Sequence, residues 1–159
     1  LLHLAYEGFW LGYGPLLSGQ PSRLATRARA ETLLARIPMQ AVVDLLAKHP
    51  EWWRTLGTAA IDYGDIATGA LADALLPDAD QRCARTLLRI GGHRYPRRTR
   101  TDRREVPVSQ QELAVLLRVS RNAVLPVLDR FAERGLVRRG YRTLEIVDLA
   151  GLEAIATAG

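Results

Sequence analysis

Residues 109–140, SQQELAVLLRVSRNAVLPVLDRFAERGLVRRG, decide the fold of this 159-residue chain. Ser109 stands three residues before Glu112, which is the spacing of a capping box, where a hydroxyl and a carboxylate satisfy free backbone amides at a helix start. Ser120 can cap a second helix that ends at Gly135. Two short helices joined by a few residues predict a helix-turn-helix.

The residues that follow predict a β-hairpin. Leu136 and Val137 precede a turn over 138–142, and residues 143–147 form the returning strand. Helix, turn, helix and hairpin together make a winged helix. The apolar residues of the second helix recur at helical spacing and are expected to face the core: they are Val124, Val127, Leu128 and Phe131.

Side chains suited to DNA stand at the ends of these predicted elements. Arg121 and Asn122 follow the second cap, where a recognition helix meets base edges; Arg pairs bidentately with guanine and Asn with adenine. Polar residues at the first helix start and arginines of the hairpin suit phosphate oxygens. An exposed arginine is also common on ordinary solvated surface, so the prediction depends on the whole set. The predicted DNA-binding residues are Ser109, Gln110, Ser120, Arg121, Asn122, Arg138, Arg139 and Arg142.

The positive charge is concentrated in the C-terminal half. The net charge is +5, and 21 of the 22 cationic residues are Arg. Residues 1–88 carry 8 basic and 9 acidic residues, whereas residues 89–159 carry 14 and 8, a net charge of +6. This asymmetry favours a polyanionic partner for the second half, and the alternative is a solvated Arg-rich surface.

The composition excludes several classes of protein. With 48% hydrophobic and 25% charged residues, the chain is an ordinary globular protein and not a disordered one. The single Cys83 cannot form an internal disulfide, and no Cys/His set has zinc-site spacing. There is no signal peptide and no apolar run of membrane-spanning length, so we expect a cytoplasmic protein without a membrane partner. No nucleophile–base pair or phosphate loop has suitable spacing, so we expect neither an enzyme nor a cofactor.

The N-terminal part predicts strands and then a helix. Gly and Pro turn signals divide residues 1–37 into runs too short for helices, which predicts short antiparallel strands. Such a segment is too small to close a core, so strands upstream of Leu1 or another subunit would cover it. Residues 38–48 predict a helix. We expect an α+β fold with a partial antiparallel β-roll over 1–50, a dimerisation helix over 51–76 and a winged helix-turn-helix domain over 77–159.

Residues 51–76 predict one long helix that Pro77 terminates. Apolar and small residues recur along it at alternating spacings of three and four, which is a heptad seam typical of helix pairing. We expect a homodimer interface, and the alternative is packing inside its own domain. Asp62, Asp65 and Asp73 are expected to be solvated. The predicted interface residues, called the heptad seam below, are Trp53, Leu56, Ala60, Tyr63, Ala67, Ala70 and Ala74.

A third helix is predicted between Pro77 and Gly91. The stretch from Gly91 to Val106 is rich in Arg and has almost nothing to bury. We therefore expect a loop or flexible ribbon there, with the domain boundary inside or just before it.

Residues 109–140 resemble the DNA-binding domain of the CRP/FNR family of bacterial transcription regulators. Residues 82–88 resemble the helix that enters this domain, and residues 51–76 resemble the family's dimerisation helix. Residues 12–28 are similar to the phosphate-binding cassette of its cyclic-nucleotide-binding β-roll. The resemblance implies that the early β-roll lies upstream of Leu1, and it places effector contacts at Gly12, Tyr13, Gly19, Ser22 and Arg23.

The cassette departs from the pattern of the cyclic-nucleotide-binding members. Tyr13 stands where these members carry a Glu, and Ser22-Arg23 reverses their Arg-Ser order. Tyr cannot accept two hydroxyl hydrogen bonds as a carboxylate can, and neighbours on a strand point to opposite faces. We therefore expect that cyclic AMP is not the effector, whose identity stays unknown.

The recognition helix also departs from the family pattern. Asn122 and Pro126 stand where members with known base contacts have Glu and Arg, and Arg118 replaces a frequent turn Gly. Pro126 lacks the amide that would bond the Asn122 carbonyl, which costs about 3 kcal/mol in a helix interior and usually produces a kink. We expect a different DNA sequence code, with loss of specific recognition as the alternative.

Together these features predict a homodimeric transcription regulator that binds a pseudopalindromic site on double-stranded DNA. RNA polymerase is a further candidate partner. The alternative is a ligand- or protein-interaction dimer whose winged helix no longer reads DNA.

Overall fold

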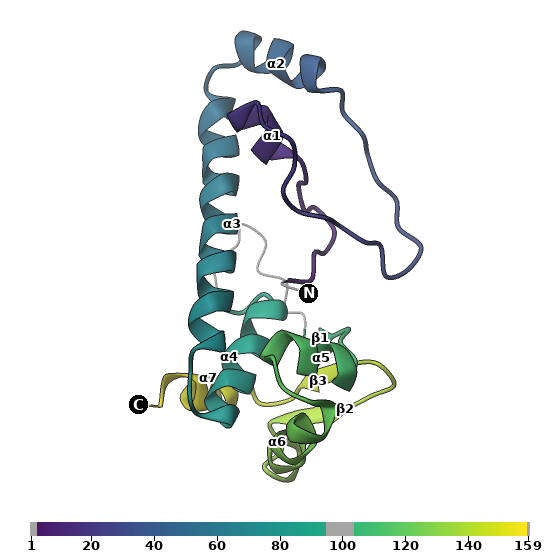
Figure 1. The fold of residues 1–159 in the computed structure, drawn as a ribbon, viewed down its shortest axis with the longest axis vertical. Helices are drawn as coiled ribbons and strands as arrows, with labels where there is room; N and C mark the ends of the chain where they lie inside the picture. The colour runs from purple at the N-terminus through teal and green to yellow at the C-terminus, as the bar shows by residue number, and fades with distance from the viewer. Residues whose placement is uncertain (1–2, 95–103, 159) are drawn as a thin grey trace. The chain divides into compact units, whose positions relative to one another are not determined.

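The computed structural model describes residues 3–94 and 104–158, which belong to two compact units (Figure 1). One unit comprises Tyr6–Tyr63, and the other runs from Gly64 onwards and includes the residues up to Ala5. The predicted α+β class is confirmed. The described elements in chain order are α1 (Tyr13–Ser18), α2 (Met39–Lys48), α3 (Trp52–Ala74), α4 (Ala79–Ile90), β1 (Glu105–Val106), α5 (Gln110–Leu117), α6 (Arg121–Glu133), β2 (Val137–Arg139), β3 (Leu144–Ile146) and α7 (Leu149–Thr157).

The N-terminal unit is helical where it is regular, so the strands predicted over residues 1–37 are wrong for the described part of that range. Residues 3–37 contain α1 and otherwise irregular backbone. A strand needs a hydrogen-bonded neighbour and a covered apolar face. Much of this segment is exposed, with Leu33 at 99%, and no described segment pairs with it.

A small core fixes α1, α2 and the first half of α3 within this unit. Val42 and Leu46 of α2 are buried against Leu56 of α3, and Leu16 of α1 packs on them. The rings of Phe9 and Tyr13 lie 4.7 Å and 4.6 Å from that of Tyr63 in α3. Two members of the heptad seam, Leu56 and Tyr63, therefore contact residues of their own unit. The helix α3 itself agrees with the long helix predicted over 51–76.

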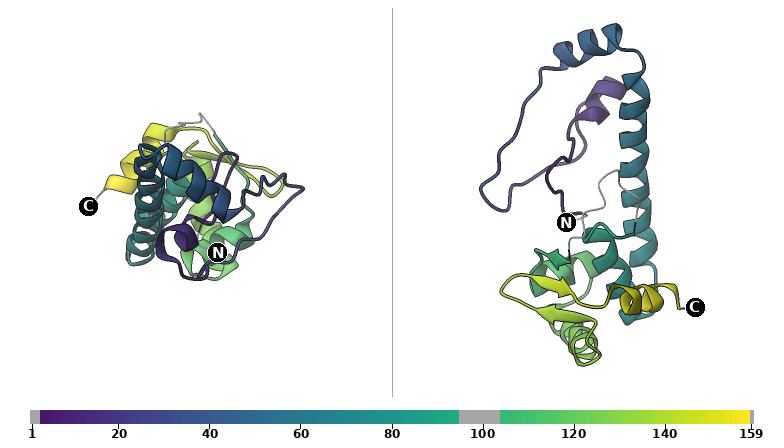
Figure 2. Two further views of the ribbon diagram at one scale, coloured as in Figure 1. Left: turned by 90° about the horizontal axis from the view of Figure 1, so that it is seen from above. Right: turned by 180° about the vertical axis from the view of Figure 1, so that it is seen from behind.

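The C-terminal unit is built around the predicted helix-turn-helix and hairpin, both of which are confirmed. Its antiparallel sheet has the order β1-β3-β2, with Val137 opposite Ile146 and Val106 opposite Leu144. The view from behind in Figure 2 shows β2 beside α6. The core is closed by side chains that are fully buried: Leu87, Ile90, Leu113, Leu128, Phe131, Ile146 and Leu152.

The structure adds two elements to this unit that the sequence pattern missed. Within the range predicted as a loop, Glu105–Val106 form β1, which pairs with β3 and buries Val106 completely. Residues 95–103 of that range lie outside the described residues. Helix α7 packs on α4, where Arg85 Nε donates to the Ala156 carbonyl at 2.6 Å.

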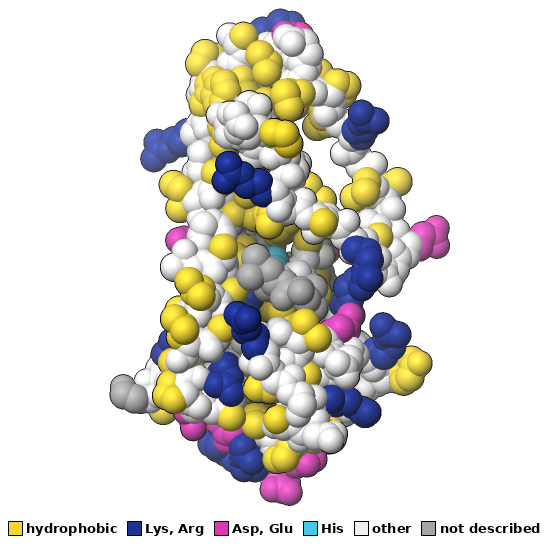
Figure 3. Space-filling view, in the orientation of Figure 1, with side chains coloured by type: hydrophobic (Ala, Val, Ile, Leu, Met, Phe, Trp, Pro, Cys, Tyr) yellow, Lys and Arg dark blue, Asp and Glu magenta, His cyan; other side chains and the backbone are white. Residues whose placement is uncertain are grey.

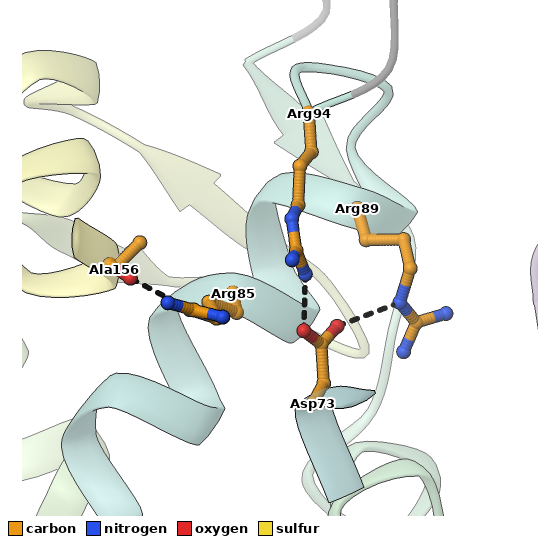
Figure 4. Close-up of polar contacts among 5 residues, drawn as sticks. All are labelled: Asp73, Arg85, Arg89, Arg94 and Ala156. Atoms are coloured by element: carbon orange, nitrogen blue, oxygen red, sulfur yellow. Dashed lines mark hydrogen bonds and ion pairs between the residues drawn. The ribbon is translucent and has the colours of Figure 1, made fainter. Parts of the chain in front are cut away.

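The last turn of α3 contains a buried carboxylate, contrary to the prediction that Asp73 is solvated. Its side chain is 1% exposed. Arg89 Nε of α4 donates to Asp73 Oδ2 at 2.9 Å, and the Arg94 guanidinium contacts Oδ1 (Figure 4). The Arg89 side chain is also 1% exposed. The burial of Asp73 is thus explained by two cationic partners that α4 and the residues after it supply.

Candidate nucleic-acid interface

The two helices of the helix-turn-helix have fixed starting points. Ser109 and Glu112 form the predicted capping box: the Ser109 amide donates to Glu112 Oε2 at 2.9 Å, and the Glu112 amide donates to Ser109 Oγ at 3.2 Å. At the start of α6, Ser120 Oγ accepts from the Ala123 amide at 3.2 Å. Both hydroxyls therefore accept hydrogen bonds from helix amides. These bonds hold the backbone in place at the first residue of each helix.

Arg118 forms the turn between these helices. Its φ is 57° and its ψ is 39°, in the left-handed region that glycine adopts most easily. The Arg118 amide donates to the carbonyls of Ala114 and Val115, which closes the last turn of α5. Arg118 adopts this conformation at a steric cost of about 1–2 kcal/mol relative to glycine.

The first turn of α6 is exposed and carries the predicted base-reading residues. Arg121 and Asn122 are both exposed. The Arg121 Nη2 atom donates to Oε1 of Gln110, the first residue of α5, at 3.1 Å. The structure thus brings Gln110 and Arg121 together across the turn, a contact that the sequence prediction did not include.

Helix α6 continues through Pro126 to Glu133. Pro126 is exposed, whereas Val127 and Leu128 beside it are buried. Arg130 Nε donates to Asp80 Oδ2 of α4 at 3.1 Å, and this hydrogen bond raises the pKa of Arg130. Core packing and this ion pair hold the helix in place despite the missing amide.

Two of the three predicted wing arginines are paired with carboxylates. Arg138 lies opposite Glu145 in the β2–β3 register, and its Nη1 atom is 2.7 Å from Glu145 Oε2. Arg139 contacts Asp129 of α6. Arg142 adopts a φ of 58° in the exposed wing turn and has no carboxylate partner among the described residues. Carboxylates thus offset the charges of Arg138 and Arg139, whereas none of the described carboxylates offsets the charge of Arg142.

The charges of the C-terminal unit are mixed on the face shown in Figure 3. Arg side chains there lie among apolar and acidic ones and do not gather in one patch. On this face, therefore, no continuous cationic patch marks the candidate interface.

The second half of the heptad seam lines an open groove in the same unit. We call this the alanine groove; its volume is about 350 Å³. Leu71 and Val115 on its rim are 60% and 48% exposed. The residues that line the groove are Ala67, Ala70, Leu71, Ala74, Arg89, Val115, Leu116 and Arg118.

The residues predicted to contact an effector lie on and after α1. Gly12 and Gly19, with φ of 89° and 67°, cap α1 at its two ends. Tyr13 begins the helix beside Tyr63, and burial raises the pKa of its hydroxyl. Ser22 Oγ donates to the Leu24 carbonyl at 3.0 Å, and Arg23 is exposed.

Other chemistry receives no support from the described residues. Burial raises the pKa of the Cys83 thiol to about 12, so this side chain stays protonated and is a poor nucleophile. Within residues 3–94 and 104–158, no group of His, Cys, Asp and Glu could hold a metal ion. None of the helices in these ranges is long and apolar enough to cross a membrane.

Comparisons with known proteins agree with this geometry. Residues 81–155 match the family model of the Crp-like helix-turn-helix domain. No curated protein matches the chain in sequence.

Solved structures of similar fold include proteins from Thermus thermophilus and Carboxydothermus hydrogenoformans. A CRP-family transcriptional regulator from Thermus thermophilus is 25% identical, with a TM-score of 0.53 over 68% of this chain and 55% of that one. A CRP/FNR-family regulator from the same organism is 23% identical, with a TM-score of 0.52 over 69% and 56%. A CooA variant from Carboxydothermus hydrogenoformans is 17% identical, with a TM-score of 0.56 over 75% and 55%.

The chain thus spans a little over half the length of these solved structures. The predicted resemblance to the CRP/FNR family is confirmed by the family model and by the fold. The capped α5 and α6 and the β2–β3 hairpin all lie within residues 81–155, the part of the chain that matches the Crp-like helix-turn-helix domain.

Proposed function

We propose that this chain is a DNA-binding transcription regulator that acts as a homodimer on a pseudopalindromic site. The observation that carries the proposal is the exposed Arg121–Asn122 pair on the first turn of α6, within a Crp-like helix-turn-helix domain. Side chains at this position of a recognition helix enter the major groove, where Arg and Asn discriminate guanine and adenine.

The homodimer is supported by the surface of α3 in the C-terminal unit. Ala67, Ala70 and Ala74 line the alanine groove, and Leu71 beside them is 60% exposed. Small side chains let a second helix approach closely, and exposed apolar ones gain free energy when it covers them. In such a dimer, two α6 helices about 34–36 Å apart would enter successive major grooves.

Cyclic AMP is not the effector in this proposal. The Tyr13 ring packs on Tyr63, and Ser22 Oγ is engaged with the Leu24 carbonyl. Neither side chain supplies the carboxylate that accepts ribose hydroxyl hydrogen bonds in the cyclic-nucleotide-binding pattern.

Selection of binding sites from random DNA tests the proposal. We expect enrichment of a pseudopalindrome with half-sites one helical turn apart, unchanged when cyclic AMP is added. A single enriched half-site would contradict the homodimer, and a cyclic AMP-dependent enrichment would contradict the effector assignment.

The second candidate is an interaction dimer whose winged helix does not read DNA. Pro126 within α6 and the carboxylate pairs of Arg138 and Arg139 favour it. Selection would then enrich no sequence, and binding to any duplex would be weak and strongly salt-dependent.

The replacement Arg121→Ala should weaken binding to the selected site by about 5- to 150-fold for each half-site, which corresponds to the about 1–3 kcal/mol of one bidentate base contact. Affinity for random DNA should change little, because it depends on phosphate contacts and the replacement removes a contact to a base. Titration of both duplexes at one salt concentration measures the two effects. The control Arg134→Ala removes an equal charge from the exposed far end of α6 and should leave discrimination intact. Equal losses on both duplexes in Arg121→Ala would exclude the base contact.

The replacement Arg142→Ala should reduce the slope of log K against log salt by about one per protomer, on every DNA sequence. The reason is that Arg142 has no carboxylate partner among the described residues, and its charge is available to a phosphate. Arg139→Ala serves as a matched comparison and should change the slope less, because Asp129 already compensates Arg139. Titrations over a range of salt concentrations give the slopes. An unchanged slope in Arg142→Ala would remove the wing turn from the interface.

A further inference from the structure

We infer that Gln110 is a positioning residue that orients the Arg121 guanidinium for base reading. The inference rests on the proposed function, because it concerns how Arg121 discriminates DNA sequences. Its basis is the contact in which Arg121 Nη2 donates to Gln110 Oε1 at 3.1 Å.

The starts of the two helices hold Gln110 and Arg121 in positions that favour this contact. Gln110 is the first residue of α5 and Arg121 is the first residue of α6. Ser109 and Ser120 cap these helices, so both side chains leave backbones whose positions are fixed by hydrogen bonds. A long arginine side chain loses much rotamer freedom when it binds, and a partner that already holds it reduces that loss.

The chemistry of the partner is suited to this role. The Gln110 amide is neutral, so it orients Arg121 and leaves the positive charge of the guanidinium uncompensated. The wing arginines show the contrast, since Arg138 and Arg139 pair with carboxylates that offset their charge. A guanidinium has five N–H donors, and a single bond from Nη2 leaves donors for the O6 and N7 atoms of a guanine.

The replacement Gln110→Ala tests the inference through a double-mutant cycle with Arg121→Ala. Alone, Gln110→Ala should reduce discrimination at the base pair that Arg121 reads by about threefold to tenfold, the range expected for one hydrogen bond. In the Arg121→Ala background, Gln110→Ala should have no further effect on discrimination. The matched control Gln111→Ala removes the exposed neighbouring amide of α5 and should show no such coupling.

A second measurement is made on the full chain without DNA. The side-chain Nε–H of Arg121 should show an ordered NMR signal in the wild type and a clearly lower order parameter in Gln110→Ala. The Nε–H of Arg134 should be unaffected. An Arg121 order parameter that does not change in Gln110→Ala overturns the inference.

The outcomes on DNA separate the two proposals. Discrimination that is lost in Arg121→Ala and unchanged in Gln110→Ala overturns the positioning role and leaves the proposed function standing. An equal affinity loss of Gln110→Ala on all sequences makes Gln110 a phosphate contact and overturns the inference as well. A wild type that discriminates no sequence overturns the proposed function, and the positioning role with it.

Discussion

The replacement Asp73→Asn should lower the free energy of unfolding by about 3–5 kcal/mol. Asp73 and Arg89 are each 1% exposed in their side chains, and Asp73 also contacts Arg94 (Figure 4). Without the carboxylate, the buried Arg89 guanidinium would lose its ion pair with Asp73, and this pair would no longer offset the free energy of removing the guanidinium from water. Urea unfolding of the full chain measures the change.

A matched control lies on the same helix. Asp65 is exposed, so Asp65→Asn should change the free energy of unfolding by less than about 0.5 kcal/mol. The apolar double replacement Asp73→Leu with Arg89→Met should be less destabilised than Asp73→Asn, because it leaves neither member of the pair charged. A loss below about 1 kcal/mol in Asp73→Asn would show that the pair is hydrated in solution.

The position of Asp73 gives this prediction a functional meaning. Asp73 lies in the last turn of α3, and Arg89 lies near the end of α4, which leads into the helix-turn-helix domain. The ion pair therefore fixes the end of the proposed dimerisation helix to the first helix of the DNA-binding domain. In the proposed homodimer, this junction would help to set the spacing of the two recognition helices.

The replacement Pro126→Ala should raise the free energy of unfolding by up to about 3 kcal/mol. Alanine supplies the amide that can bond the Asn122 carbonyl, and it removes the ring that crowds this carbonyl. Pro126 is exposed, so no buried contact is lost. Urea unfolding gives the stability, and repetition of the site selection shows whether the preferred DNA sequence changes with the shape of α6.

The control for this replacement is a proline outside a helix interior. Pro38 is the N-cap residue of α2 and is exposed, so Pro38→Ala should stay within about 1 kcal/mol of the wild type. A Pro126→Ala protein no more stable than the wild type would mean that α6 is not strained by its proline.

The helix-turn-helix could be predicted because its signals are local. In the capping box, Ser109 and Glu112 are three positions apart in the sequence, and Ser120 Oγ accepts from the amide of Ala123, which is also three positions away. Caps and helical periodicity depend on neighbouring residues in one helix, so the sequence carries them directly. The hairpin of β2 and β3 is local in the same sense.

The elements that were missed depend on distant partners. Glu105–Val106 form a strand because β3 offers its edge at Glu145 and Leu144. A strand of two residues is too short to show a periodic sequence pattern. Its pairing depends on the position of β3 in the folded domain. The N-terminal segment is the opposite case: its turn signals indicated strands, yet no described segment pairs with them.

The candidate site shows the same division. The exposure of Arg121 and Asn122 followed from their position after a cap. The pairing of Arg138 with Glu145 could have been found from the hairpin register, since the two residues face each other across it. The pairing of Arg139 with Asp129, and of Arg121 with Gln110, joins different elements and required the structure.

The sequence by itself determined the helices from α2 to α6, the caps of α5 and α6, the wing and the place of the proposed base-reading side chains. Each of these depends on residues a few positions apart. Only the tertiary structure decided which charged side chains are paired with an opposite charge and which are not. Asp73 is buried because α4 brings Arg89 to it, and Arg139 is compensated because β2 lies beside α6. Charge pairing depends on distances in space between elements, and a net charge of +5 does not specify those distances.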